Sequence, residues 1–167
     1  MHLRPLVPSD REPLVALLQR TEAFNAADVG VAVELIDETL ENPDQSTYRF
    51  IVAVEEGEGD EKTYFGYVCF GHTPMTRHTY DLYWIVVDPG HRGKGIGHEL
   101  LRALTATLAH SGGRILRVET SSSEMYRSAK GFYKRAGFVE GGRIPDFYRD
   151  RDDLIIYYKA VEAPDRD

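Results

Sequence analysis

The fold of this chain is decided by one stretch of sequence, Val87-Asp88-Pro89-Gly90-His91-Arg92-Gly93-Lys94-Gly95-Ile96-Gly97. An apolar run over 82–87 precedes it and is typical of a buried strand, and apolar residues at the spacing of one helix face follow it. The stretch is therefore expected to be the turn between a strand and a helix N-terminus. Glycines let such a turn approach a ligand closely, and a helix N-terminus favours an anion. Because Arg92 and Lys94 add positive charge, the stretch predicts a binding site for a phosphorylated small molecule.

The spacing within this glycine-rich stretch limits which phosphate ligand it can hold. A P-loop would need a hydroxyl residue directly after Lys94, where the chain has Gly95. The dinucleotide fingerprint G-x-G-x-x-G fits Gly95 and Gly97 but places Leu100 at its third glycine. Glu119 follows roughly 20 residues on, where an acidic ribose ligand is expected. A dinucleotide site and a glycine turn without a ligand both stay open as alternatives.

Two motifs resemble the GNAT N-acetyltransferase superfamily. The pattern Arg92-x-x-Gly95-x-Gly97 resembles its acyl-CoA pyrophosphate loop, Q/R-x-x-G-x-G/A. The segment 129–138, AKGFYKRAGF, resembles the A-x-x-F-Y-x-x-x-G-F sequence of its later helix. The motifs occur in the family's order, and the resemblance extends from about Tyr80 to the C-terminus. It implies that the donor is acetyl-CoA and that its pyrophosphate is bound by Arg92, Gly93, Lys94, Gly95, Ile96 and Gly97.

The rest of the chain agrees with the element order of that superfamily. Residue patterning predicts strands over 3–7, 48–55, 64–71, 80–87, 114–119, 138–144 and 154–159, and helices over 11–20, 25–40, 95–110 and 124–136. The order β-α-α-β-β-β-α-β-α-β-β predicts an α/β fold of the mixed α+β type. The resemblance implies a mostly antiparallel central sheet that is splayed at the acyl-CoA site. One domain is expected over 1–163, followed by a loose tail over 164–167.

Composition restricts the function further. The net charge of −7 argues against nucleic acid as a partner, because a protein that binds nucleic acid presents a basic surface. No apolar run approaches the ~20 residues that cross a bilayer, and the N-terminus lacks a signal stretch, so we expect a cytoplasmic protein without a membrane partner. The histidines and the single cysteine have no metal-ligand spacing, and no metal is predicted. Cys69 lies among apolar neighbours, which favours a core thiol over an acyl-carrying nucleophile.

The resemblance also implies a mechanism, in which an amine attacks the thioester of acetyl-CoA directly. Such an attack needs a base for the amine proton and an acid for the leaving thiolate. Tyr133 lies at the position of the family's general acid, and a phenol with an ordinary pKa of about 10 is protonated at neutral pH. Packing beside Phe132 is the alternative role for Tyr133. Glu119 ends a strand where the peptide N-terminal branch of the superfamily has a base, and otherwise it is a surface carboxylate that caps the next helix.

Further residues are placed in the donor site by the resemblance alone. The backbone of Ile85, Val86 and Val87 is expected to pair with the pantetheine arm. Three residues before the alanine of the later helix, the family often has an asparagine that contacts coenzyme A. This chain has Tyr126 at that position, and we assign it to the donor site.

The acceptor side is marked by fewer residues. Asp81 and Tyr83 form the polar face of their strand and are expected to line the acceptor pocket, unless Asp81 is an exposed residue at the strand end. Phe147 and Tyr148 fall in a segment, 145–154, that resembles the loop over the acceptor site in protein N-terminal acetyltransferases. A charged hairpin turn is the alternative for that segment.

The sequence as a whole predicts a GNAT-type N-acetyltransferase. It would transfer the acetyl group of acetyl-CoA to a primary amine of a small molecule or a peptide. Two other functions stay open: a non-catalytic acyl-CoA sensor or interaction domain on the same fold, and a nucleotide-binding α/β domain. A homodimer is considered as well, because dimers are common on this fold.

Overall fold

The computed structural model describes residues 1–162, and the expected tail at 164–167 therefore lies outside the described residues. The chain forms two compact units. The first comprises Met1–Gly71 and Trp84–Leu104, and the second comprises His72–Tyr83 and the chain from Thr105 onward. That the chain is one functional domain stays a prediction.

The helices and strands follow the predicted order. Along the chain they are β1 (His2–Pro5), η1 (Pro8–Asp10), α1 (Arg11–Arg20), α2 (Ala26–Glu41), β2 (Tyr48–Glu56), β3 (Lys62–His72), β4 (Thr79–Val87), η2 (Pro89–His91), α3 (Ile96–His110), β5 (Ile115–Ser121), η3 (Glu124–Tyr126), α4 (Arg127–Arg135), β6 (Val139–Arg149) and β7 (Asp152–Ala160). Most bounds lie within two residues of the prediction, and two elements differ from it by more. The helix expected over 124–136 is divided into η3 and α4, because Tyr126 has φ −98° and ψ 14°. β6 continues to Arg149 instead of ending at Ile144.

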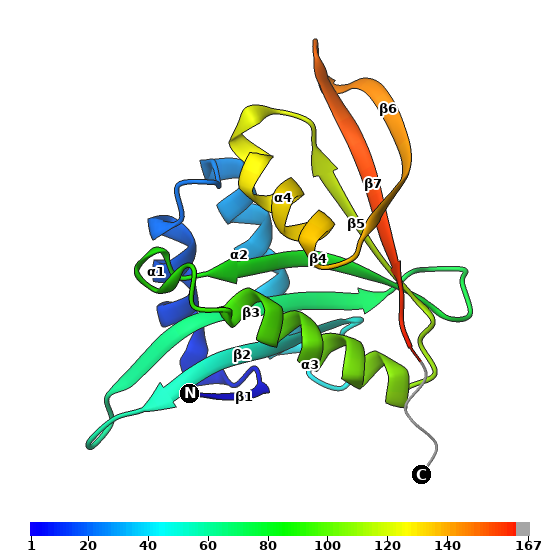
Figure 1. The fold of residues 1–167 in the computed structure, drawn as a ribbon. Helices are drawn as coiled ribbons and strands as arrows, with labels where there is room; N and C mark the ends of the chain where they lie inside the picture. The colour runs from blue at the N-terminus through cyan, green and yellow to red at the C-terminus, as the bar shows by residue number, and fades with distance from the viewer. Residues whose placement is uncertain (163–167) are drawn as a thin grey trace. The chain divides into compact units, whose positions relative to one another are not determined.

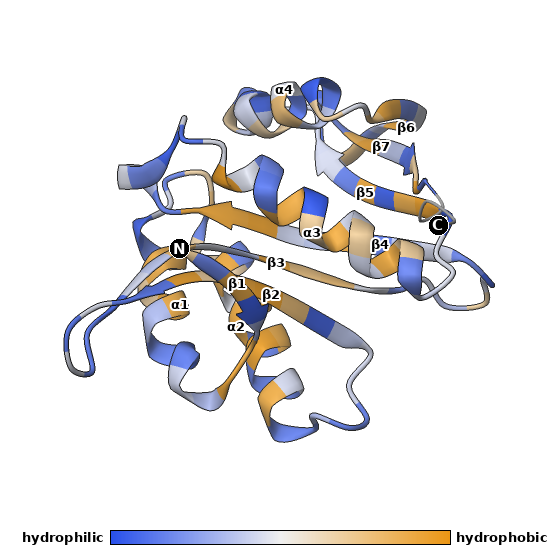
Figure 2. Cartoon of the chain, turned by 60° about the horizontal axis from the view of Figure 1, so that its bottom comes forward, coloured by the Kyte–Doolittle hydropathy of each residue, from blue (hydrophilic) through white to orange (hydrophobic). Residues whose placement is uncertain are grey.

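The first unit packs two helices against antiparallel strands. β2 pairs with β1 on one side and with β3 on the other, both antiparallel, and the β2–β3 hairpin is as predicted. α1 and α2 bury apolar side chains against this sheet, and the core includes Leu14, Leu17, Leu18, Ile36, Phe50, Val52 and Tyr67. Polar residues (blue) lie on the outward turns of both helices in Figure 2. The apolar spacing in 11–20 and 25–40 is therefore the pattern of a helix face buried on a sheet.

The second unit is built on β5 and β7. β5 pairs in parallel with the start of β4 and antiparallel with β7, and β7 pairs antiparallel with β6. α4 covers one face of these strands (Figure 1). On that face the ring of Tyr133 contacts the rings of Phe138 and Tyr157. Within the described chain, the parallel ladder joins Thr79–Asp81 to Ile115–Arg117 and includes no later residue of β4. The two strands thus part after Asp81.

β4 takes part in both units, and the hydrogen-bonded strand order is β1-β2-β3-β4-β5-β7-β6. One parallel ladder among antiparallel ones makes the sheet mixed, which confirms the predicted fold class. α3 ends at His110, and Gly112, with φ 78°, lets the N–H of Gly113 bond the carbonyl of Leu108 at 2.8 Å. Over residues 1–162, no helix is long and apolar enough to cross a bilayer.

Candidate active site

The glycine-rich stretch of the first unit is a turn that leads into α3, as its sequence predicts. Gly93 has φ 76° and Gly95 has φ 81°, a left-handed conformation that side-chain-bearing residues rarely adopt. A Cβ atom on either glycine would meet no other atom within 4 Å, so this part of the backbone is bare. α3 starts at Ile96, and its first turn, which includes Gly97, has N–H groups without partners in a preceding turn. With Arg92 and Lys94 exposed beside it, the turn fits the pyrophosphate of an acyl-CoA donor.

Asp88 holds the start of this turn. Its side chain accepts hydrogen bonds from Arg20 Nη2 at 2.8 Å and from the N–H of Gly90 at 3.1 Å, and it lies 2.8 Å from His91 Nδ1. Only 8% of Asp88 is exposed. Burial acts to raise its pKa, but the hydrogen bonds from Arg20 and His91 outweigh burial and hold the pKa below its ordinary value. Asp88 is therefore an ionised anchor for the turn.

The sequence analysis did not assign a function to Asp88 or to Arg20. An aspartate followed by proline and glycine is a local turn signal, and it could have predicted the bond between Asp88 and Gly90. Arg20 is 68 residues away and ends another helix, so no local pattern connects it to Asp88. The ion pair is visible only in the folded chain.

The residues expected to pair with pantetheine lie in the half of β4 that belongs to the first unit. Val86 is buried, and its carbonyl lies against β3, since a Cβ atom on Gly66 would be 2.3 Å from it. Ile85 and Val87 are half-buried. Directly before them, the ring of Trp84 meets the ring of Phe24 edge-on, at a centroid distance of 5.1 Å.

Tyr133, the expected general acid, is buried on α4 in the second unit. Its ring centroid lies 5.5 Å from that of Phe138 and 6.0 Å from that of Tyr157. The ring of Phe132 is 5.7 Å away, so the packing role considered for Tyr133 is real as well. Burial raises the pKa of Tyr133, and the phenol therefore keeps its proton through the neutral range.

Glu119, the expected base, belongs to a row of polar side chains across β4 and β5. Arg117 donates from Nε to Asp81 at 2.7 Å, and its Nη1 lies 3.1 Å from Glu119 Oε1. Asp81 also accepts from the hydroxyl of Thr73 at 2.9 Å. The hydrogen bond to Asp81 raises the pKa of Arg117 against the effect of burial. The structure thus joins the predicted base Glu119 to the predicted acceptor residue Asp81 through one guanidinium group.

The structure excludes two of the alternative roles considered for these residues and adds one residue that the sequence analysis missed. Asp81 is not an exposed strand-end residue, because only 8% of it is exposed. The side chain of Glu119 pairs with Arg117, and the N-cap residue of η3 is Ser123, so Glu119 is not a helix cap. Arg117 was missed, although it lies two residues before Glu119 and so on the same face of the strand.

Tyr133, on α4, packs against one face of β5, and the side chain of Glu119 lies on the opposite face. Tyr157, which contacts Tyr133, is paired in register with Val118, and both are buried. Successive residues of a strand point to opposite faces, so Glu119 points away from α4.

The remaining predicted residues are placed as follows. Tyr83 lies two residues after Asp81 on β4 and is partly exposed. Tyr126 is half-buried at the junction of η3 and α4. Phe147 and Tyr148 are exposed, and their rings meet edge-on at 5.0 Å.

The segment around Phe147 and Tyr148 corrects one prediction. It is not a loop but the end of β6, and the chain turns back at Asp150 and Arg151 into β7. The N–H of Arg151 donates to Asp146 Oδ1 at 2.6 Å, which ties this turn together. The charged hairpin turn, the alternative considered for 145–154, is therefore what forms.

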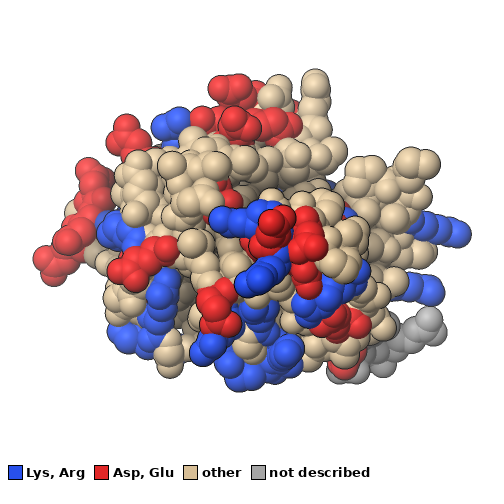
Figure 3. Space-filling view, turned by 90° about the horizontal axis from the view of Figure 1, so that it is seen from above, with Lys and Arg blue, Asp and Glu red and all other residues tan. Residues whose placement is uncertain are grey.

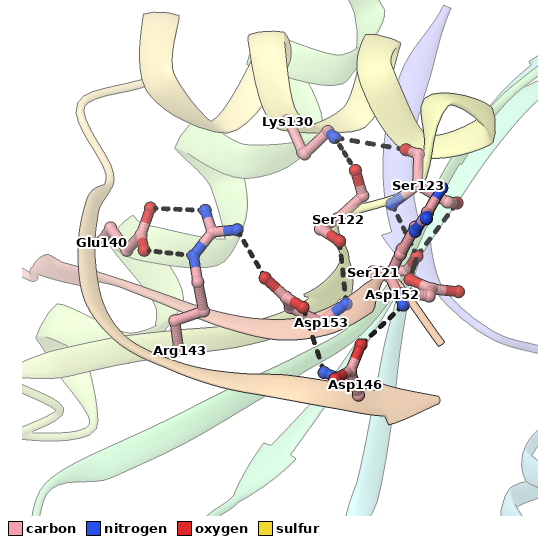
Figure 4. Close-up of polar contacts among 10 residues, drawn as sticks. Ser121, Ser122, Ser123, Lys130, Glu140, Arg143, Asp146, Asp152 and Asp153 are labelled. Carbon is pink, nitrogen blue, oxygen red and sulfur yellow. Dashed lines mark hydrogen bonds and ion pairs between the residues drawn. The ribbon is translucent and has the colours of Figure 1, made fainter. Parts of the chain in front are cut away.

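A polar network fixes the chain directly after Glu119 (Figure 4). The hydroxyl of Ser121 donates to Asp152, which is buried and is also bonded by Arg149 Nε at 3.1 Å. The N–H of Ser122 donates to the carbonyl of Asp153 at 2.9 Å, and the hydroxyl of Ser122 accepts from the N–H of Asp153 at 2.8 Å. From α4, Lys130 donates to the carbonyls of Ser122 and Ser123. The segment 121–123 is therefore held by β7 and by α4.

A cysteine nucleophile and a metal site were also considered in the sequence analysis. Cys69 is fully buried, burial raises the pKa of its thiol, and the core role is confirmed. In residues 1–162 no group of three His, Cys, Asp or Glu side chains is arranged to hold a metal ion, and the absence of a metal stays a prediction. Acidic and basic side chains are interspersed on the face drawn in Figure 3.

The structure combines a mixed sheet, a glycine turn at the start of α3 and a buried tyrosine on α4. Together these features are typical of an acyl-CoA-dependent acyltransferase. The chain belongs to the GNAT acetyltransferase family, because residues 46–140 match the model of the acetyltransferase (GNAT) domain. This membership confirms the resemblance seen in the sequence and excludes the dinucleotide-binding alternative. It also bears out the expectation of an acetyltransferase.

This chain is also similar to individual acetyltransferases. A Desulfovibrio desulfuricans protein assigned to the GNAT family has a solved structure that is 36% identical, with a TM-score of 0.89, over 96% of this chain and 99% of that one. The mycothiol acetyltransferase of Frankia alni is 35% identical over 116 residues, which are 66% of this chain and 33% of that protein. An aminoglycoside 6'-N-acetyltransferase complexed with coenzyme A has the same fold, with a TM-score of 0.74 and 20% identity over the whole of both chains. The chain spans a third or less of the curated relatives it matches.

Proposed function

We propose that this chain transfers the acetyl group of acetyl-CoA to a primary amine by direct attack. The observation that carries the proposal is the bare, left-handed backbone at Gly93 and Gly95 ahead of α3, inside the matched GNAT segment. A turn of this kind costs most side chains strain, and it gains from a bound anion. The donor site would consist of Arg92, Gly93, Lys94, Gly95, Ile96 and Gly97, with Ile85, Val86, Val87 and Tyr126 along the pantetheine arm.

In this proposal two side chains of the second unit perform the proton transfers. Glu119 accepts a proton from the amine, whose nitrogen attacks the thioester carbonyl carbon. The carbon–sulfur bond then breaks, and Tyr133 gives its proton to the leaving thiolate. The exposure of the Glu119 carboxylate and the burial of the Tyr133 phenol, which keeps its proton, support this division.

The proposal also covers the acceptor, the assembly and the location of the protein. Asp81, Tyr83, Phe147 and Tyr148 would contact the acceptor, which is a small molecule or a peptide. The proposed assembly is a homodimer, because dimers are common on this fold. A cytoplasmic location is supported by a single cysteine that is buried as a free thiol.

Removal of one hydroxyl group tests the mechanism. We expect Tyr133→Phe to lower kcat by about 100-fold, which is the usual contribution of a positioned acid or base. Acetyl-CoA affinity, measured by calorimetry, should not change, because the hydroxyl acts on the leaving sulfur and not on the bound pyrophosphate. Tyr67→Phe is the matched control, since the Tyr67 hydroxyl is buried and has no hydrogen-bond partner among the described residues.

Two results would contradict the proposal. An unchanged kcat in Tyr133→Phe would remove this residue from the reaction. Acetyl-CoA binding without thiol release, in the presence of amines of every class, would make the chain a non-catalytic acyl-CoA sensor.

A further inference from the structure

A strip of apolar side chains borders Glu119 on its own face of the sheet. Residues directly opposite one another on paired strands point to the same face. Arg117 is opposite Tyr158 of β7, and Tyr158 is opposite Val139 of β6. Tyr158 is 43% exposed and Val139 is 52% exposed, although both are large apolar side chains. These two residues therefore leave an apolar surface uncovered beside the polar row of Asp81, Arg117 and Glu119.

The strip has a low point directly across from Glu119. Glu119 is opposite Ile156, which is opposite Gly142. A Cβ atom on Gly142 would first meet the tip of Ile156 at 3.9 Å, so the space above this glycine is open. Next to it, the ring of Tyr158 leans over Gly141, where a Cβ atom would lie 2.8 Å from the ring. The strip is thus a shallow trough with Gly142 as its floor and Ile156 and Tyr158 as its walls.

The charges around the trough select one kind of occupant. On this face Asp81 and Glu119 share one guanidinium, that of Arg117, which leaves one net negative charge. Two cations of β6 and β7 lie on the other face: Arg143 pairs with Glu140 and Asp153, and Lys159 donates to the carbonyl of Ala136. Arg149, at the far end of β6 on the trough face, is paired with Asp152 and adds no net charge. A single positive charge complements this surface, whereas a polycation would find too few carboxylates.

We propose that the trough is the subsite for the carbon body of the acceptor, and that the acceptor is a monoamine on a flat, apolar body such as an aromatic ring. The body lies over Gly142 between Ile156 and Tyr158, and the amine reaches Glu119. This inference rests on the proposed function, since it names the substrate class of the same site. It makes Gly142 and Tyr158 specificity-determining residues that the sequence motifs do not include.

The test compares two amines by binding and by turnover. The probes are 2-phenylethylamine, which has one charge and a flat ring, and spermidine, which is a polycation. We expect the protein to bind 2-phenylethylamine in NMR titrations, and to release thiol from acetyl-CoA faster with it than with spermidine. Gly142→Val fills the floor of the trough and should weaken binding and lower kcat/KM for 2-phenylethylamine by about ten-fold, the lower range for a blocked apolar contact.

Controls separate the trough from general damage. Gly142→Val should leave acetyl-CoA affinity unchanged and should lower the kcat/KM for 2-phenylethylamine more than the kcat/KM for spermidine. Gly30→Val is the matched substitution, since a Cβ atom there also meets nothing within 4 Å. Tyr158→Ala is a second variant, which should weaken 2-phenylethylamine in the same way without inserting any group.

The outcomes distinguish this inference from the proposed function. Binding of 2-phenylethylamine that Gly142→Val weakens, without thiol release, would support the trough and refute the acetyl transfer. Thiol release with spermidine, but no binding of 2-phenylethylamine, would overturn the trough and leave the acetyl transfer standing. A dimer in sedimentation that Tyr158→Ala dissociates would assign the strip to a second copy of the chain, and would also overturn the inference.

Discussion

Two aspartates on β4 or at its end, Asp88 and Asp81, look alike and do different things. Each is 8% exposed, and each binds an arginine from a distant part of the chain. Asp88 bonds Arg20 and the N–H of Gly90, so its partners are the turn itself and a helix end. Asp81 shares Arg117 with Glu119, so its partner also holds the carboxylate that we propose as the base. The same chemical pair therefore fixes a backbone in the first unit and orients a side chain in the second.

A third aspartate, Asp10, gives a reference for a purely structural pair. It is fully buried and accepts from Arg4 through both oxygens, at 2.6 and 2.7 Å. The hydroxyl of Tyr64 at 2.8 Å and the N–H of Val7 at 2.9 Å complete its partners. These contacts lie within the first unit and include no residue of the proposed site. Loss of Asp10 should therefore affect stability alone, and this sets the scale for the other two aspartates.

The largest effect is expected for Asp10→Asn. Removal of one partner of a buried ion pair costs about 3 kcal/mol of the free energy of unfolding, which urea titration measures. Burial acts to raise the pKa of Asp10, but Arg4, Val7 and Tyr64 outweigh it and hold the pKa below its ordinary value. The stabilisation is therefore complete above the unfolded pKa of about 4 and is lost as pH falls through the lower folded pKa. The difference between wild type and variant should shrink below about pH 4.

Asp37→Asn is the control for that measurement. Asp37 also binds an arginine through both oxygens, but the pair with Arg11 is exposed. Water screens an exposed pair, and we expect no measurable change in stability. Equal losses in the two variants would show that burial does not set the strength of these pairs.

An intermediate effect is expected for Asp88→Asn. An amide cannot hold the Arg20 guanidinium by charge, so the turn loses its anchor. We expect the dissociation constant of acetyl-CoA to rise about ten-fold, equal to about 1.4 kcal/mol, while kcat at saturating donor stays the same. Calorimetry with acetyl-CoA measures this change, and Asp37→Asn is again the control. If the affinity stays the same at an unchanged unfolding midpoint, Asp88 does not shape the donor site.

The smallest effect is expected for Asp81→Asn. Glu119 would then be the remaining carboxylate partner of Arg117, and the negative charge of Asp81 would be lost. A pair with Arg117 alone would hold the Glu119 carboxylate more tightly, so Glu119 should accept the amine proton less readily. We expect kcat/KM for the amine to fall by about three-fold, a typical consequence of a fraction of 1 kcal/mol. Weaker acetyl-CoA binding in this variant would contradict the separation between the two aspartates.

The donor side could be predicted from the sequence because its signals are local. Positive φ at Gly93 and Gly95, the start of α3 and the apolar face that follows all come from neighbouring residues. Membership of residues 46–140 in the GNAT family confirms the motif. The ion pair from Arg20 to Asp88 could not be predicted, since it depends on how α1 packs in the first unit.

The acceptor side shows why the remaining features were missed or mistaken. Arg117 and Glu119 share a strand face by the period of two, but Asp81 joins them only through the parallel register of β4 and β5. In the sequence, the chain from 145 onward looks like a loop, because proline and aspartate are typical of turns. In the structure, Asp146 does have a positive φ, of 52°. An edge strand tolerates both, because β6 pairs on one side with β7 and the opposite N–H groups are not needed. Local signals therefore predicted a loop, and the pairing with β7 produced a strand.

The edge-on contact between Phe24 and Trp84 has a practical consequence. Trp84 is the one tryptophan of the sequence, so indole fluorescence has a single source in this protein. That source is half-buried at the start of the β4 segment proposed for the pantetheine arm. The chain thus contains its own spectroscopic probe, at a position where a ligand along β4 would change the polarity around the indole.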